Sequence, residues 1–190
     1  RSAVSFLRLN AKRFNLDPKR FGAAGESSGG HLTALLATTS DTNEFQKHPV
    51  PRKASSAIQA ASPWCGPTDF LKLNDVKASQ DYSRRQSAPS RLIGAPIKEA
   101  PEKCRQANPI TYVSKGDPPC FIVHGDRDFV VPLNQSELLH AALKKAGAPS
   151  TLHVVKGGEH GFSKLTPAND EIVKKVMNFF DRQFKPEGGR

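Results

Sequence analysis

The chain has 190 residues, of which 37% are hydrophobic and 24% are charged, and its net charge is +10. This composition supports the core of one soluble domain, and the absence of any apolar run of about 18 residues excludes a membrane-spanning helix. The basic residues are scattered and have no interleaved aromatic residues for base stacking, so we expect no nucleic-acid partner.

The first half of the chain is predicted to form two helices and two strands. Apolar residues repeat at helical spacing over residues 2–15, and Asp17-Pro18 is typical of a helix end. A short strand is predicted over residues 20–25, and a second helix over Leu32 to about Thr39. Residues 56–61 are expected to form another short strand.

Residues 63–115 show no long period and are rich in proline, serine and charge. We therefore expect one domain spanning residues 1–190, with a cap-like insertion over this stretch. The apolar side chains of the insertion are the predicted lining of a substrate pocket: Trp64, Phe70, Leu71, Tyr82 and Leu92.

The second half alternates strand and helix more clearly. Residues 120–123 form an apolar run that suits a parallel strand buried on both faces. A helix around residues 138–143 is closed by Gly147, and residues 151–155 are the next predicted strand. Thr166-Pro167 is expected to begin a last helix with this apolar face: Ile172, Val173, Val176, Met177, Phe180 and Phe184. The alternation predicts an α/β fold with a mostly parallel sheet flanked by helices.

The three cysteines show no metal-binding spacing, so the sequence predicts no metal site. Cys120 opens the apolar run and is expected to be a buried thiol. Cys65 and Cys104 are candidates for a disulfide if the protein is exported. The chain begins at Arg1 and its only methionine is Met177, which favours a fragment or a processed product. The compartment, cytoplasmic or exported, and the oligomeric state therefore stay open.

Gly25-Glu26-Ser27-Ser28-Gly29 fits the G-x-S-x-G pattern between a predicted strand and a predicted helix. That context is the one a nucleophile elbow requires, because a sharp turn exposes the serine hydroxyl above the sheet. The helix N-terminus behind the serine supplies backbone N–H groups, so that of Ser28 is the predicted oxyanion donor.

A nucleophilic serine needs a base, and the base needs an acid. Of six histidines, His160 lies in a glycine-rich loop after the last predicted strand, where α/β folds place functional groups. Asp126 and Asp128 both follow the buried strand, and their two-residue separation means that only one of them is expected to face the histidine.

His124–Pro132 fits an H-G-x-x-D-x-x-V-P block, and Gly25–His31 fits a G-E-S-[AS]-G-G-H elbow. Together with Asn108–Val113 and Gly158–Phe162, these segments resemble bacterial esterase and lipase members of the α/β-hydrolase superfamily, and the carboxylesterase and feruloyl-esterase-like group in particular. The resemblance implies that Asp128 is the acid. It also implies that the family's first strands and its oxyanion loop are missing from this chain.

The resemblance implies ester hydrolysis through an acyl-enzyme, with Ser27, His160 and Asp128 as the triad and with no cofactor. Its expected substrate is a small-molecule or carbohydrate-linked ester. A peptidase of the prolyl-oligopeptidase type is the alternative among hydrolases. A non-catalytic binding protein on a hydrolase scaffold is the alternative outside them.

Overall fold

The computed structural model describes residues 1–40, 54–162 and 168–185. Its centre is a parallel sheet of four strands in the order β1-β2-β3-β4. The strands are β1 (Gly22–Glu26), β2 (Ala60–Trp64), β3 (Cys120–Gly125) and β4 (Ser150–Val155). All four strands point the same way, so the loops that follow them gather at one edge of the sheet, and the α/β fold with a parallel sheet is confirmed.

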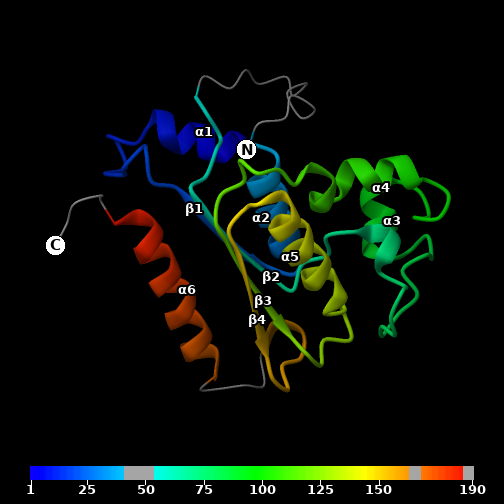
Figure 1. Cartoon of the computed structure of the whole chain (residues 1–190). Coiled ribbons are helices and arrows are strands. Elements are labelled where there is room, and N and C mark those ends of the chain that lie inside the picture. The colour runs from blue at the N-terminus through cyan, green and yellow to red at the C-terminus, as the bar shows by residue number, and fades with distance from the viewer. Residues whose placement is uncertain (41–53, 163–167, 186–190) are drawn as a thin grey trace.

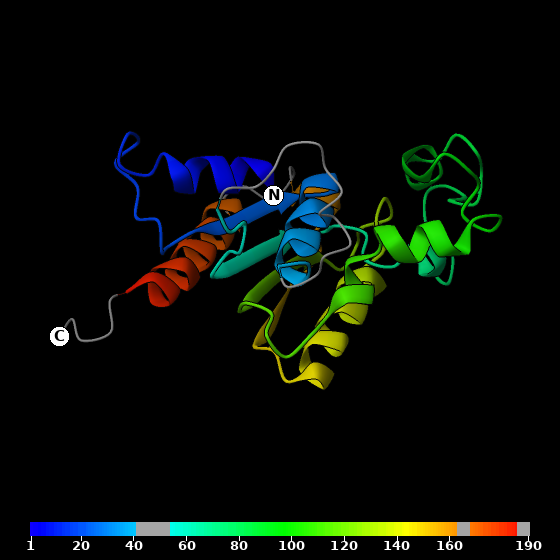
Figure 2. The ribbon, with the colours of Figure 1, turned by 90° about the horizontal axis from the view of Figure 1, so that it is seen from above.

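Helices cover both faces of the sheet, as Figures 1 and 2 show. Helices α2 (Ser28–Thr38) and α5 (Asn134–Ala146) pack on one face, and α6 (Ala168–Phe184) packs on the other. Helix α1 (Ser2–Leu9) adds Val4 to the edge of the α2–α5 layer. No helix in the described part of the chain is both long and apolar enough to cross a membrane.

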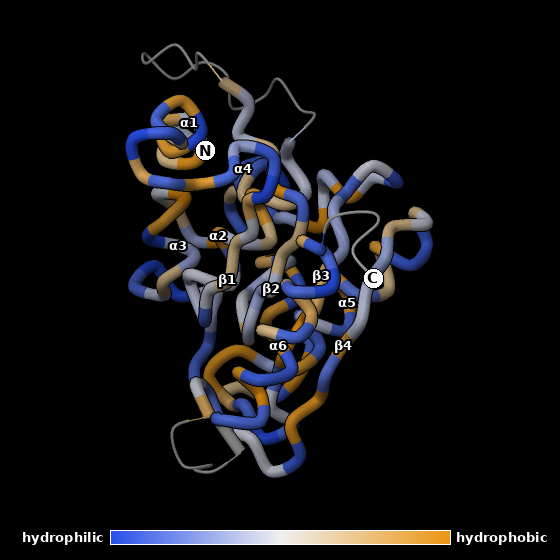
Figure 3. Tube along the Cα trace, turned by 90° about the vertical axis from the view of Figure 1, so that its left-hand side faces the viewer, coloured by the Kyte–Doolittle hydropathy of each residue, from blue (hydrophilic) through white to orange (hydrophobic). Residues whose placement is uncertain are grey.

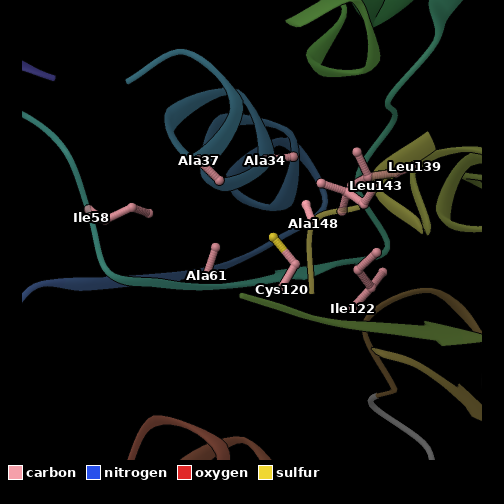
Figure 4. Packing of buried hydrophobic residues seen from close by; sticks show 9 residues of the cluster. All are labelled: Ala34, Ala37, Ile58, Ala61, Cys120, Ile122, Leu139, Leu143 and Ala148. Carbon is pink, nitrogen blue, oxygen red and sulfur yellow. The ribbon is translucent and has the colours of Figure 1, made fainter. Parts of the chain in front are cut away.

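The core between the sheet and the α2–α5 layer is built from small residues on α2 and larger ones on α5 (Figure 4). Alanines on α2 let this helix lie close to β1 and β2, while leucines on α5 fill the wider gap over β3. The buried members are Ala34, Ala37, Ile58, Ala61, Cys120, Ile122, Leu139, Leu143 and Ala148. Cys120 is thus a buried thiol, as predicted, and burial raises its pKa to about 12.

Helix α6 buries a stripe that differs in part from the predicted one. Ile172, Val176 and Phe179 are buried against the sheet, whereas Val173 and Met177 are 48% and 56% exposed. The sequence assignment was wrong for these two because it placed the stripe one residue further round the helix. Figure 3 shows both hydrophobic and hydrophilic residues along α6, as expected for a helix with one face on the sheet.

Several predicted boundaries also shift. Helix α1 ends at Leu9 instead of residue 15, because Asn10 turns its side-chain amide back onto the carbonyl of Phe6 and the following residues form turns. The predicted strand 56–61 is replaced by β2 at residues 60–64, in register with β1. Thr166-Pro167, the predicted start of the last helix, lies outside the described residues.

The segment between β2 and β3 contains four short helical pieces: η1 (Phe70–Lys72), α3 (Ala88–Ile93), α4 (Pro101–Ala107) and η2 (Pro109–Tyr112). It has a small core of its own, built around Phe70, Leu73, Tyr82, Ile97 and Cys104. Pro63 and Trp64 belong to β2, so the excursion begins at Cys65 and not at residue 63.

Two buried side-chain amides hold this segment in place, one on α5 and one within the segment itself. The side-chain oxygen of Gln135 on α5 accepts the N–H groups of Thr68 and Asp69, at 2.9 and 2.8 Å. The side-chain oxygen of Asn108 accepts the N–H of Phe70 at 2.9 Å. These bonds fix the backbone just before η1, where the segment passes over the end of the sheet.

Candidate active site

Ser27 lies in the turn between β1 and α2 with φ 55° and ψ −118°. A positive φ is rare for a residue with a side chain and persists only where the surroundings enforce it. Here the N–H of Ser27 donates to Trp64 O at 2.9 Å, and its own carbonyl accepts the N–H of His31 at 2.9 Å. The strand and the helix together therefore hold the strained turn that the motif predicted.

Glycines allow α2 to approach the strand ends closely. A Cβ on Gly30 would lie 2.3 Å from the Trp64 carbonyl oxygen, and one on Gly25 would lie 2.5 Å from Gly29 O. Ser28 is the first residue of α2, so its N–H is one of the helix-terminal donors that no helical carbonyl accepts. This N–H lies beside Ser27 at the positive end of the helix dipole.

His160 lies in η3 (His160–Phe162), the short turn after β4. Its Nε2 is 2.9 Å from Ser27 Oγ, and its Nδ1 is 2.7 Å from Asp128 Oδ2. These contacts join residues 27, 128 and 160 into one hydrogen-bonded row at the C-terminal edge of the sheet. The hydrogen bond with Asp128, and after it the contact with Cys65, raise the pKa of His160, and burial opposes this shift only in part.

Asp128 is fully buried as a side chain and holds its charge through hydrogen bonds. Its Oδ1 accepts the N–H groups of Val130 and Val131, each at 2.8 Å. Burial alone would raise the pKa of Asp128, but hydrogen bonds from His124, His160 and Val131 outweigh it and lower the pKa to about 2. The carboxylate is therefore ionised at any pH at which the fold is expected to work.

Asp126, the other candidate acid, points elsewhere: its Oδ1 accepts the N–H of Gly157 at 2.6 Å. His124 has a structural role. Its Nε2 is 2.8 Å from the Val131 carbonyl and 3.3 Å from Asp128 Oδ2, and its Nδ1 is 2.6 Å from Ser136 Oγ. This buried histidine supports the loop that carries Asp128. His124 is part of the sequence motif, but the motif alone does not indicate these contacts.

Cys65 was not among the predicted site residues, yet it lies next to the triad. Its sulfur, the Asp128 carboxylate and a His160 ring nitrogen lie within 4.8 Å of one another. Cys104 is buried in the core of the insertion, and all three cysteines are free thiols, so the disulfide between Cys65 and Cys104 is not formed. The cysteine spacing could not indicate the position of Cys65, because that position depends on how β2 ends.

An apolar cavity of about 220 Å³ lies between the start of α2 and the insertion. Its lining comes from both parts of the chain: Ser28, His31, Pro67, Phe70, Ala88, Pro89 and Leu92. Phe70 and Leu92 were predicted for such a pocket. Trp64, Leu71 and Tyr82 are not among its lining residues, because Trp64 packs against Phe162 on the α6 side and the other two pack in the core of the insertion.

Three further histidines take structural roles. His31 stacks on Phe70, with ring centroids 5.2 Å apart, and its Nδ1 is 2.9 Å from Pro67 O. His140 contacts Ser150, and His153 contacts Lys175. His48 lies outside the described residues.

The model of the BD-FAE family matches residues 1–143 of the chain. The chain belongs to the BD-FAE family. A structurally similar protein, a truncated carbohydrate esterase from gut microbiota, gives a TM-score of 0.82 at 32% identity. That match covers 95% of this chain and 65% of the other.

Other relatives of this BD-FAE chain carry esterase names. Esterase LipQ of Mycobacterium tuberculosis is 28% identical, over 94% of this chain and 41% of its own length. Esterase 2 of Thermogutta terrifontis, solved as its sarin-phosphonylated form, gives a TM-score of 0.73 at 26% identity, over 95% of this chain and 63% of the other. The chain thus has the α/β-hydrolase fold and spans less than half of its curated relative LipQ.

Proposed function

We propose that this chain carries the catalytic residues of a serine carboxylic-ester hydrolase. The observation that carries the proposal is the unbroken row from Ser27 Oγ through His160 to Asp128, at 2.9 and 2.7 Å. Both separations are within the range of real hydrogen bonds, and the hydroxyl belongs to a strained elbow that has no structural need for a serine.

The proposed reaction has two halves. Ser27 Oγ attacks the ester carbonyl while Nε2 of neutral His160 takes its proton, and the imidazolium then returns this proton to the leaving alcohol. Water attacks the resulting acyl-enzyme with His160 again as base, which releases the carboxylic acid and restores Ser27. Asp128 keeps the proton of the neutral ring on Nδ1 and stabilises the imidazolium.

The oxyanion formed in each half is proposed to accept the N–H of Ser28. A donor of this kind is worth about 10²–10³ in kcat in a serine protease. The adjoining cavity is apolar and opens beside Ser28, so we assign it to the apolar part of the ester.

The substrate is proposed to be an ester of a small or carbohydrate-linked alcohol. This choice is supported by likeness to the carbohydrate esterase from gut microbiota and to a bifunctional GH43-CE protein of Bacteroides eggerthii, which gives a TM-score of 0.81 at 31% identity. No cofactor or metal ion takes part in the proposed reaction.

The test compares 4-nitrophenyl acetate, an acetylated xylo-oligosaccharide and a peptide 4-nitroanilide as substrates for the chain and its Ser27→Ala variant. We expect turnover of both esters, loss of nearly all turnover in the variant, and no comparable anilide cleavage. Faster anilide cleavage would favour a peptidase, as the 28% identity to the uncharacterized peptidase YuxL of Bacillus subtilis allows. Ester turnover that survives Ser27→Ala would refute the triad.

A variant of Leu92 tests whether the cavity holds the apolar part of the ester. Leu92 lines the cavity and is 63% exposed, so it can be truncated with little risk to the fold. Leu92→Ala should lower kcat/KM for butanoate more than for acetate. Val76→Ala, an exposed residue of the same insertion that does not line the cavity, is the matched control. Equal ratios in both variants would show that the cavity does not contact the acyl chain.

A further inference from the structure

Cys65 is held in place by the architecture of the elbow. It directly follows β2 and has φ 37°, and its N–H donates to Val123 O at 2.8 Å. The next residue, Gly66, passes so close to α2 that a Cβ there would lie 2.4 Å from the His31 nitrogen and 3.0 Å from Ser27 O. The backbone of Cys65 is therefore held in place, and its fully buried side chain lies beside Asp128 and His160.

The side chains around this sulfur form a donor set for a soft or borderline divalent cation. A thiol, an imidazole and a carboxylate lie within 4.8 Å of one another, and these are the three ligand types that bind Zn²⁺ in proteins. Tetrahedral ligands at zinc bond lengths are about 3.3–3.6 Å apart, so closure requires movements of about 1 Å. His160 is 20% exposed, which leaves its ring accessible to an incoming ion.

We propose that Cys65, Asp128 and His160 form an inhibitory binding site for Zn²⁺ and chemically similar cations such as Cd²⁺. Binding releases the Cys65 thiol proton to solvent, so the thiolate and the Asp128 carboxylate neutralise the two charges of the ion, while neutral His160 contributes a lone pair. The fourth position remains for water. The sequence predicted no such site, because the three donors meet only in the folded chain.

The inhibitory part of the proposal rests on the proposed function. A cation on Nε2 of His160 takes the lone pair that should receive the Ser27 proton. A cation on Nδ1 displaces the Asp128 hydrogen bond and leaves the ring proton on Nε2. Either mode removes the base, so a bound cation should inhibit ester turnover.

The binding test uses Cd²⁺ alone, because cadmium–thiolate bonds absorb in the near ultraviolet and report ligation without any enzyme assay. The chain should bind one Cd²⁺ with this absorbance and with proton release measured by calorimetry. Cys65→Ser should abolish the band. Cys104→Ser and Cys120→Ser, which remove the other two buried thiols, should keep it.

His160→Ala should weaken Cd²⁺ binding by at least about 100-fold, since changes to residues that merely support a ligand already cost 10–100-fold. The near-ultraviolet circular dichroism of each variant checks that it is folded, and the wild-type titration stands even if a variant is not. A wild-type chain without the band would overturn the site, as would full affinity in Cys65→Ser or in His160→Ala.

Esterase activity is measured separately with Zn²⁺ added at several concentrations. Inhibition that weakens in Cys65→Ser supports the proposal. Cd²⁺ binding at Cys65 in a chain that hydrolyses no ester would leave the site intact and reject the proposed function instead. Binding of Cd²⁺ with undiminished ester turnover would reject the inhibitory role.

Discussion

At the scale of single residues, Asp128 differs from Asp126 in its partners and not in its chemistry. Asp128 is bonded to His160 and to two backbone N–H groups, whereas Asp126 is bonded to Gly157. The conservative changes Asp128→Asn and Asp126→Asn therefore form a matched pair. The side-chain amide at residue 128 would favour the wrong histidine tautomer, which costs about 10⁴ in kcat in a serine protease.

We expect Asp128→Asn to lower kcat on an activated ester by a factor of this order, and Asp126→Asn to change it little. Steady-state kinetics of the two variants decides the matter. If Asp126→Asn lowered kcat more than Asp128→Asn, the carboxylate bonded to His160 in the structure would not be its partner in catalysis.

The pH dependence follows from the raised pKa of His160, whose ordinary value is 6.5. The ring acts as a base only when it is neutral, so activity is full above its pKa and is lost as the pH falls through it. We expect kcat/KM to fall on the acidic side with an apparent pKa above 6.5. In Asp128→Asn the residual activity should show a lower apparent pKa, because the carboxylate that raises it is gone.

A pH–rate profile from pH 5 to 10 measures both values. The same acidic limb in the wild type and in Asp128→Asn would show that Asp128 does not set the pKa of the base.

At the scale of elements, the junction of β1, β2 and α2 determines the site. Gly30 faces the Trp64 carbonyl with no space for a Cβ, whereas a Cβ on the adjacent Gly29 would meet nothing within 4 Å. Gly30→Ala should therefore push α2 away from β2 and destabilise the fold. Gly29→Ala should be neutral or stabilising by up to about 1 kcal/mol, because alanine favours a helix over glycine.

Chemical denaturation of the two variants compares their free energies of unfolding, and ester turnover shows whether the elbow is disturbed. Equal stability of the two variants would contradict the close approach of α2 to the strand end.

The sequence predicted a strand correctly where an apolar run marks it, and it misplaced the strand that has no such run. The apolar run at residues 120–123 identified β3, but β2 includes Pro63, which reads as a strand breaker. Pro63 lies opposite Gly25 in the parallel pair, where the strand tolerates it. The convergence of Ser27, Asp128 and His160 was predictable because each of these residues follows a strand in a local motif. The contacts of Cys65 and His124 were not, because they arise only from tertiary packing.

At the scale of the whole molecule, β1 pairs with β2 alone among the described strands and so lies at the edge of the sheet. Nearby α1 and the turns after it leave Phe6, Leu9, Phe14 and Leu16 at least 40% exposed. An open edge beside apolar surface invites association of chains through unpaired backbone groups. Among the described residues, this surface combines an unpaired strand edge with exposed apolar side chains.

We expect the 190-residue chain to self-associate in a concentration-dependent manner, as measured by light scattering. Ala24→Lys, at an exposed position of β1, should reduce association, and Ala141→Lys, at an exposed position of α5, is the control of equal charge. A monomeric wild-type chain, or equal effects of the two lysines, would show that the β1 edge is not the contact.

If Ser27 is a nucleophile activated by His160 and Asp128, a fluorophosphonate should label its side-chain oxygen covalently. Mass spectrometry of the intact chain and its peptides should show one adduct, located on Ser27. Labelling should slow greatly in Asp128→Asn and nearly vanish in His160→Ala. The absence of an adduct, an adduct on Ser28 or another residue, or undiminished labelling in His160→Ala would contradict the account.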